Sequence, residues 1–254
     1  LWLGTISSGI LKFDPQTETL TAWPLIKTSG VETRSVRAIM CDHNGQMWLG
    51  SRDDGLFKFY PDQNKFIHVN GKKGFEISSP TIRAVFEDHE GTIWVGTANG
   101  LNRYDQKTDQ FSVFRAYPQT PNQNNIYEIS ESPDGQLLYL ACFRGGFQIF
   151  NKKTNSFKIY DIKSPDKKQN STSYAMCFEF LTPDSVILGT YGGGLFIFSL
   201  KTGGLRNITE KNGLANNSIY GILKFQNTLW LSTNRGISKL NLKTGNIRNF
   251  GIKN

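Results

Sequence analysis

The chain has 254 residues, and its 29 Lys and Arg against 21 Asp and Glu give a formal net charge of +8 at pH 7. No stretch approaches the roughly 20 consecutive apolar residues of a membrane-spanning helix, and the first residues lack the order of a signal peptide. The positive charge does not form a basic run, which argues against nucleic acid as a partner. An anionic partner of another kind stays open.

One phrase recurs six times along the chain: an apolar pair, a small residue, a short polar loop and a glycine that opens a second apolar stretch. Its anchor residues are Trp2, Trp48, Trp94, Tyr139, Ile187 and Trp230. Their mean spacing of about 45 residues is typical of propeller blades. Because no linker separates the copies, we predict one β-propeller domain over residues 1–254. Its repeats lie near residues 1–30, 31–76, 77–120, 121–168, 169–213 and 214–254.

In chain order, the first repeat begins at its second strand, so its inner strand is missing from the sequence. The inner strands of the later repeats are expected at residues 35–39, 81–85, 125–129, 173–177 and 218–222. Turns such as Asp42-His43-Asn44-Gly45 follow, in which Asn, Asp and Gly supply the left-handed dihedrals of a tight hairpin. We assign the turn histidines, His43 and His89, no role beyond these hairpins.

The second strand of each repeat holds the anchor residue, the third begins at the glycine, and the fourth follows a second polar turn. The anchor ring can cover a neighbouring blade, and the small residue two positions later, such as Gly50, is expected where blades approach closely. The predicted fold is therefore all-β: a propeller of four-stranded antiparallel blades. An open ring exposes sheet edges, so we expect the remainder of a longer chain to complete it.

The three cysteines are odd in number and fall within strand-like runs. We interpret Cys41, Cys142 and Cys177 as small buried apolar residues and not as a disulfide framework. A Cys142–Cys177 bridge between neighbouring blades is the alternative.

Residues 36–59 and 82–104 share the pattern Val/Ile-x-x-Ile, then Asp-x-x-Gly-x-x-Trp, then Gly-Leu-x-x-Phe/Tyr. This pattern resembles the two-component regulator propeller repeat, and the resemblance extends over essentially the whole chain. It implies a seven-bladed propeller in the periplasmic part of a hybrid two-component sensor histidine kinase of the inner membrane. Such receptors sense oligosaccharides derived from glycans. The resemblance also implies a homodimeric receptor, kinase activity in the full-length protein, and membrane contact only through segments outside this sequence.

In a propeller, the connections into the inner strands and the loops between the second and third strands lie on one face. The candidate ligand-binding residues on that face are Arg37, Arg52, Asp54, Arg83, Asn99, Tyr127, Arg144, Tyr191, Tyr220 and Arg235. The third inner-strand position, taken as Arg37, Arg83, Tyr127, Ala175 and Tyr220, varies within a constant frame, as expected of a binding surface. Tyrosines can stack on sugars, and arginines can bind hydroxyl, carboxylate or sulfate groups. An oligosaccharide, neutral or acidic, is the predicted ligand.

Two other functions stay open: a non-catalytic protein-interaction scaffold, and a glycan lyase or hydrolase. His43, His68 and His89 fall on elements that do not easily converge on one metal. Asp53 and Asp54 are neighbours in one loop, whereas glycosidases need two carboxylates opposed across the sugar. We therefore predict no enzyme activity, metal or cofactor for this region. The polar loop at 164–173 is expected to be a mobile surface loop.

Overall fold

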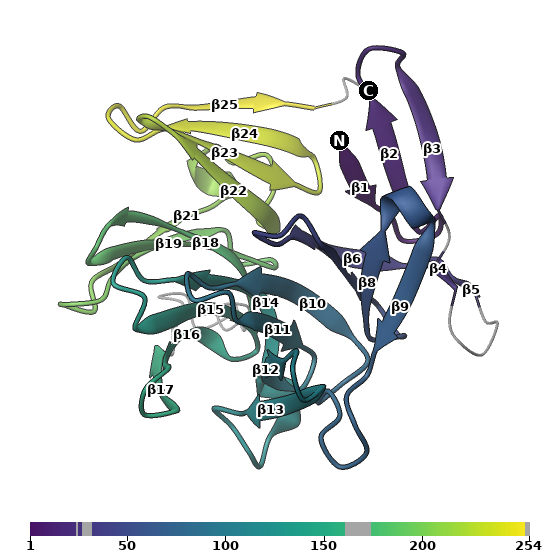
Figure 1. Cartoon of the computed structure of the whole chain (residues 1–254). Coiled ribbons are helices and arrows are strands. Elements are labelled where there is room, and N and C mark those ends of the chain that lie inside the picture. The colour runs from purple at the N-terminus through teal and green to yellow at the C-terminus, as the bar shows by residue number, and fades with distance from the viewer. Residues whose placement is uncertain (24, 27–31, 161–173, 252–254) are drawn as a thin grey trace. The chain divides into compact units, whose positions relative to one another are not determined.

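A computed structural model describes residues 1–23, 25–26, 32–160 and 174–251 of the chain (Figure 1). The regular structure of these residues is β-strand, apart from three single-turn 3-10 helices, η1 (Pro61–Gln63), η2 (Pro121–Gln123) and η3 (Glu210–Asn212). The prediction of an all-β propeller is confirmed. No helix in the described ranges is long and apolar enough to cross a bilayer. The loop expected at 164–173 lies outside the described residues, which resume at Tyr174.

The blades are antiparallel sheets whose strands follow one another in chain order. The first has three strands, β1 (Trp2–Gly4), β2 (Ile10–Asp14) and β3 (Thr19–Trp23). Five four-stranded sheets follow: β6 (Val36–Cys41), β7 (Met47–Ser51), β8 (Leu56–Tyr60), β9 (Lys65–Val69); β10 (Ile82–Glu87), β11 (Ile93–Thr97), β12 (Gly100–Asp105), β13 (Gln110–Phe114); β14 (Asn125–Glu131), β15 (Leu137–Phe143), β16 (Gly146–Asn151), β17 (Ser156–Tyr160); β18 (Ala175–Thr182), β19 (Ser185–Thr190), β20 (Leu195–Ser199), β21 (Leu205–Ile208); and β22 (Ile219–Phe225), β23 (Thr228–Thr233), β24 (Gly236–Asn241), β25 (Ile247–Phe250). A small hairpin, β4 (Leu25–Ile26) and β5 (Glu32–Thr33), precedes the second blade.

The chain divides into two compact units. Unit 1 comprises Leu1–Leu138 and Asn151–Ser156, and unit 2 comprises Tyr139–Phe150 and Phe157–Asn254. In unit 1 the inner strands β6, β10 and β14 are neighbours, and in unit 2 the inner strands β18 and β22 are neighbours. Each unit therefore brings the inner strands of successive blades side by side.

The anchor tryptophan of the second blade, Trp48, covers the next blade, as predicted. Trp48 is fully buried among Ile82, Ile93 and Val95 of the third blade. Its indole Nε1 donates a hydrogen bond of 2.9 Å to Asp42 Oδ2 in the preceding turn, and Oδ1 of that carboxylate accepts two backbone N–H groups of the same turn. The Asp-x-x-Gly-x-x-Trp motif is thus one hydrogen-bonded unit that satisfies a buried carboxylate and a buried indole together.

The small residue after each anchor marks a close approach of two blades, as predicted. A Cβ on Gly50 would lie 2.8 Å from Ile82 Cβ, and one on Gly96 would lie 2.9 Å from Ile126 Cγ2. Real atoms do not approach so closely, so glycine is required there. In unit 2, Ala141 of the fourth blade takes the place of the glycine. The buried residue in the same cluster is Ala175, where the other blades have Ile82 and Ile126.

Four inner strands, β6, β10, β18 and β22, carry a β-bulge at their second residue. Val36 pairs with Ser51 and Ala38 with Gly50, so Arg37 between them is an extra residue without a partner in β7. The same shift leaves Arg83, Met176 and Tyr220 as the extra residues of β10, β18 and β22. The prediction that Ala175 occupies this position in the fifth repeat is wrong by one residue. Ala175 is buried and pairs with Thr190, and the register shift follows it, so Met176 is the extra residue.

Two further expectations are corrected. None of the three cysteines forms a disulfide, and Cys142 and Cys177 are buried, but Cys41 at the end of β6 is exposed. The turn histidines also do more than close hairpins. His43 bonds Glu87 of the third blade through its ring and its backbone N–H, and His89 bonds Glu131 of the fourth blade in the same way.

Candidate functional site

The unit 1 part of the predicted site centres on Arg83 and Tyr127. These residues come from the neighbouring inner strands β10 and β14, and the Arg83 guanidinium carbon lies 4.8 Å from the centre of the Tyr127 ring. The Arg83 Nε atom is buried and has no hydrogen-bond partner. Burial raises the pKa of the Tyr127 phenol, and the positive charge of Arg37 opposes that rise in its pKa without cancelling it. Arg37, Arg83 and Tyr127 are therefore brought together.

The other unit 1 candidates serve the loops in which they stand. Arg52 is exposed and pairs loosely with Asp53 at 3.6 Å. The Asp54 carboxylate accepts a hydrogen bond from Thr33. Asn99 is tied to the Ser78 carbonyl and to the guanidinium of Arg115. Their ligand-binding role stays a prediction.

In unit 2 the predicted residues gather around an aromatic cluster. The rings of Phe143 and Tyr174 are stacked with centroids 4.5 Å apart, and Tyr191 lies 6.2 Å from Phe143. Arg144 lies over the Tyr174 ring at 5.9 Å. Its φ of 66° is uncommon for a residue other than glycine, and such conformations cluster at functional sites. Tyr191 is about half exposed, so the cluster presents an aromatic edge to solvent.

The last two candidates lie on the final blade. Tyr220 is the bulged residue of β22 and is 43% exposed. Arg235, in the turn before β24, pairs with Glu210 at 3.7 Å on the surface. Sequence reasoning left Tyr174 and Met176 out of the site. The register of the bulge, which local pattern does not reveal, would have identified Met176.

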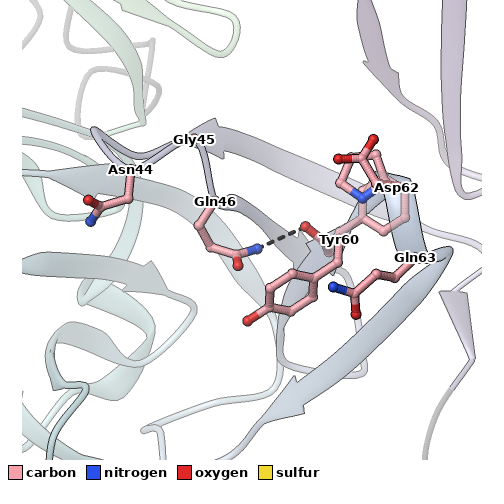
Figure 2. A pocket seen from close by; sticks show the side chains of 8 residues that line it. Asn44, Gly45, Gln46, Tyr60, Asp62 and Gln63 are labelled. Atoms are coloured by element: carbon pink, nitrogen blue, oxygen red, sulfur yellow. Dashed lines mark hydrogen bonds between the residues drawn. The ribbon is translucent and has the colours of Figure 1, made fainter.

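Two hollows of the described surface lie away from these residues. One of about 300 Å³ is lined by residues of the β6–β7 turn, the end of β8 and η1, where Gln46 Nε2 donates to the Phe59 carbonyl at 2.8 Å (Figure 2). Another, of about 580 Å³, lies between Glu90 and the β12–β13 turn. None of the ten predicted residues lines either hollow.

Lys152, Asp88 and Glu131 form a charged cluster that stabilises unit 1. Lys152 Nζ lies 3.0 Å from Asp88 Oδ2 and 2.6 Å from Glu131 Oε1. Burial lowers the pKa of Lys152, but the hydrogen bonds to Glu131 and Asp88 outweigh it and raise that pKa overall. Burial raises the pKa of Asp88, but the hydrogen bonds from Trp94 and Lys152 have the larger effect. The pKa of Asp88 is therefore lowered overall. All three groups stay charged at neutral pH and hold two turns together.

The described residues offer no obvious catalytic or metal centre. Within the ranges placed by the structure, no three His, Cys, Asp or Glu side chains are positioned to hold one metal ion. The clustered groups of the predicted site are guanidinium groups and aromatic rings, which bind and stack but supply no acid and base pair.

Comparison with known proteins supports the same family. Residues 30–53 and 76–99 match the sequence profile of the two component regulator propeller. No curated protein matches the sequence significantly.

Solved structures resemble the fold. The extracellular domain of BT3049 from B. thetaiotaomicron, assigned as a hybrid two component system, has a TM-score of 0.71 and 23% identity over 85% of this chain and 30% of its own. The extracellular domain of BT4673 from the same organism has a TM-score of 0.56 and 19% identity over 98% and 40% of the two chains. PorZ, a surface component of the type-IX secretion system of Porphyromonas gingivalis, has a TM-score of 0.70 and 14% identity over 96% and 37%.

The chain thus spans less than half the length of each of these proteins, and at these identities the likeness concerns the fold alone. The family profile is more specific, because it matches the two segments that carry the Asp-x-x-Gly-x-x-Trp unit seen in the second and third blades. Residues 30–53 and 76–99 thus carry the repeat of the two component regulator propeller family.

Proposed function

We propose that this chain is an extracytoplasmic ligand-sensing propeller of a hybrid two-component system and that it binds an oligosaccharide derived from a glycan. One observation carries the proposal. The bulged position of the inner strands is structurally constant, yet it holds Arg37, Arg83, Met176 and Tyr220 in different blades. Bulges re-aim side chains and are common beside functional sites. A rigid frame that presents arginine, methionine and tyrosine side chains at equivalent points is suited to binding a sugar.

The aromatic cluster of unit 2 supports a carbohydrate ligand. Sugar rings present apolar C–H faces that pack on aromatic rings, and their hydroxyls accept hydrogen bonds from a guanidinium. Phe143, Tyr174 and Tyr191 supply the rings, and Arg144 supplies the donor. The solved structures of BT3049 and BT4673 support the sensing role, since they are described as extracellular domains of two-component systems.

The signal would pass as a change in arrangement and not as a deformation of blades. Side chains such as Trp48 and Trp94 are fully packed between blades, which leaves little room for internal movement. Binding would shift the population between two orientations of rigid parts. The receiving parts in this proposal are the rest of the receptor, a second receptor subunit and a histidine kinase.

The test is a thermal-shift screen of the intact extracytoplasmic region against neutral and acidic oligosaccharides, followed by calorimetry and a product assay. Saturable stabilisation without product supports a sensor. Tyr174→Ala should weaken binding, whereas Tyr60→Ala, at the hollow of Figure 2, should leave it unchanged. Product formation would show an enzyme instead, and no binding by any oligosaccharide would contradict the proposal.

A protein-interaction scaffold is the second candidate, and one observation favours it. On the final blade Leu223, Phe225 and Ile237 expose 65%, 63% and 43% of their surface. The residue that corresponds to Ile237 in the second blade, Leu56, is fully buried because the third blade covers it. This face therefore suits a further blade of the same kind. Co-purification of a separate propeller protein bound to this face, without any glycan binding, would favour this candidate.

A further inference from the structure

We propose that Arg37, Arg83 and Tyr127 form a subsite for the anionic group of an acidic oligosaccharide, a carboxylate or a sulfate ester. This inference rests on the proposed function, since it names the class of sugar that the sensor selects. It concerns unit 1 alone, where all three residues lie on neighbouring inner strands.

Backbone geometry turns the two arginines away from the core. Arg37 and Arg83 are the extra residues of their bulges, and Val36 and Ala38 on either side of Arg37 are buried. Val36 and Ile82, which precede them, are buried against the neighbouring blade. The arginines therefore stand at equivalent points of adjacent blades, with Arg37 exposed and Arg83 partly buried.

Neither arginine forms an ion pair with a carboxylate in the part of the chain that the structure describes. Among the described residues, no carboxylate pairs with Arg37, and the contact of Arg83 is the ring of Tyr127. By contrast, Arg115 bonds the carbonyl and side-chain oxygens of Asn99, and Arg235 pairs with Glu210. Two guanidinium groups on adjacent strands repel each other, and an anion between them would relieve this repulsion.

Buried polar atoms without partners gather at the same strands. Arg83 Nε, Ser35 Oγ and Asn125 Oδ1 are all buried and lack hydrogen bonds within the described part of the chain. Ser35 stands two residues before Arg37, and Asn125 stands two residues before Tyr127. An unsatisfied buried donor or acceptor costs about 1–3 kcal/mol, so such atoms in a native protein call for a partner. A bound ligand would supply partners for the guanidinium and the hydroxyl.

The chemistry of the three side chains suits an oxyanion attached to a sugar. A guanidinium donates two parallel hydrogen bonds to a carboxylate or sulfate. Stacking on Tyr127 fixes the plane of the Arg83 fork, because the cation lies over the ring face. A phenol is protonated at neutral pH, and burial raises the pKa of Tyr127 still further, so its hydroxyl keeps its proton. Carboxylate and sulfate share this chemistry.

The first experiment uses inorganic sulfate as a minimal probe of the intact extracytoplasmic region. Its melting temperature is measured in sodium sulfate and in sodium chloride at equal ionic strength. We expect additional stabilisation by sulfate in the wild type and its loss in Arg37→Met and Arg83→Met. Arg103→Met is the matched control, because Arg103 also lies over an aromatic ring but stands on β12. Because Arg37 is exposed, its variant tests the subsite even if Arg83→Met misfolds.

The second experiment measures affinity by calorimetry for three tetrasaccharides. They are a galacturonic acid tetramer, a sulfated carrageenan tetramer and a neutral β-1,4-linked galactose tetramer. We expect at least one acidic tetramer to bind about tenfold or more tightly than the neutral one, and each Arg→Met change to weaken that tetramer by about 10- to 100-fold. Arg83→Lys, which keeps the charge but loses the fork, should lie between wild type and Arg83→Met. Which acidic tetramer binds separates carboxylate from sulfate.

The outcomes distinguish the two proposals. Equal binding of neutral and acidic tetramers, unaffected by Arg37→Met, would overturn the subsite and leave the sensor standing. Sulfate stabilisation that depends on Arg37, without binding of any oligosaccharide, would keep an anion site and overturn the glycan sensor. Absence of both effects would overturn both.

Discussion

A single aspartate in the turn after an inner strand organises several buried groups. Asp88 accepts the Trp94 indole N–H at 2.8 Å, two backbone N–H groups of its own turn and the ammonium of Lys152. Asp42 makes the indole and backbone bonds in the second blade, but its carboxylate has no lysine bonded to it within the described residues. The two positions therefore form a natural comparison of the same motif with and without a buried ion pair.

We predict that Asp88→Asn destabilises the protein more than Asp42→Asn does. The amide nitrogen of asparagine would face a second donor at both sites, which costs about 1–3 kcal/mol. At Asp88 the change also removes one of the two close carboxylates that neutralise the largely buried Lys152, and breaking a buried pair costs about 3–5 kcal/mol. Urea unfolding gives the free energy of unfolding of each variant. Equal losses at the two positions would contradict a stabilising role of Lys152.

At the scale of the element, a pair of blades is joined by a repeated link between a turn histidine and a glutamate of the next inner strand. His43 contacts Glu87, and His89 contacts Glu131 at 2.9 Å. The hydrogen bond to Glu87 and its negative charge raise the pKa of His43 above its ordinary value of 6.5. This link is therefore sensitive to pH.

The sign of that sensitivity follows from the direction of the shift. A raised pKa means that the folded state holds the proton more tightly than the unfolded state. The stabilisation is complete below about pH 6.5 and is lost as pH rises through the folded-state pKa. We predict that the melting temperature of wild type minus that of His43→Gln is largest in mildly acidic buffer and shrinks in alkaline buffer. A difference that is constant with pH, or that grows as pH rises, would contradict the prediction.

Blade packing predicts a coupling between Gly50 and Ile82. Gly50→Ala would place a methyl group against Ile82 and should cost about 1–3 kcal/mol by overpacking. Ile82→Ala alone should cost about 2–5 kcal/mol through the cavity that it leaves. The double variant recreates the Ala141 and Ala175 combination of unit 2, in which both side chains are small and buried. Its loss should be smaller than the sum, because the added methyl occupies part of the cavity.

A double-mutant cycle based on denaturant unfolding measures this coupling. We expect an interaction energy above about 0.5 kcal/mol, the limit within which independent sites usually add. Strict additivity would mean that the neighbouring strand shifts to absorb the methyl group.

At the scale of the whole molecule, local pattern predicted the blades because turn residues and alternating strands are short-range signals. It also located the close approach at Gly50, since a small residue recurs after each anchor. It missed the His43–Glu87 link and the Lys152–Asp88 pair, whose partners are 44 and 64 residues apart in the chain. The register of β18 was missed because a bulge adds a residue without a local sign. The ligand-binding role of the ten predicted residues stays a prediction.

The reactivity of the cysteines with an alkylating reagent measures how often the surrounding structure opens. Cys41 in unit 1 is exposed, whereas Cys142 and Cys177 in unit 2 are buried. Burial raises the pKa of the Cys142 thiol, and alkylation requires the thiolate, so both access and ionisation oppose its reaction. We predict that iodoacetamide labels Cys41 rapidly in the native protein, while Cys142 and Cys177 react only when unit 2 opens.

Mass spectrometry of peptides after timed alkylation measures the three rates, and labelling in urea is the control in which all three thiols should react alike. The ratio of native to unfolded rate then reports how often unit 2 opens. Since β15 and β18, which carry the buried thiols, belong to different blades, equal protection of both would mean that these blades open together. Rapid native labelling of Cys142 would instead mean that its blade opens alone, contrary to the packing of the unit.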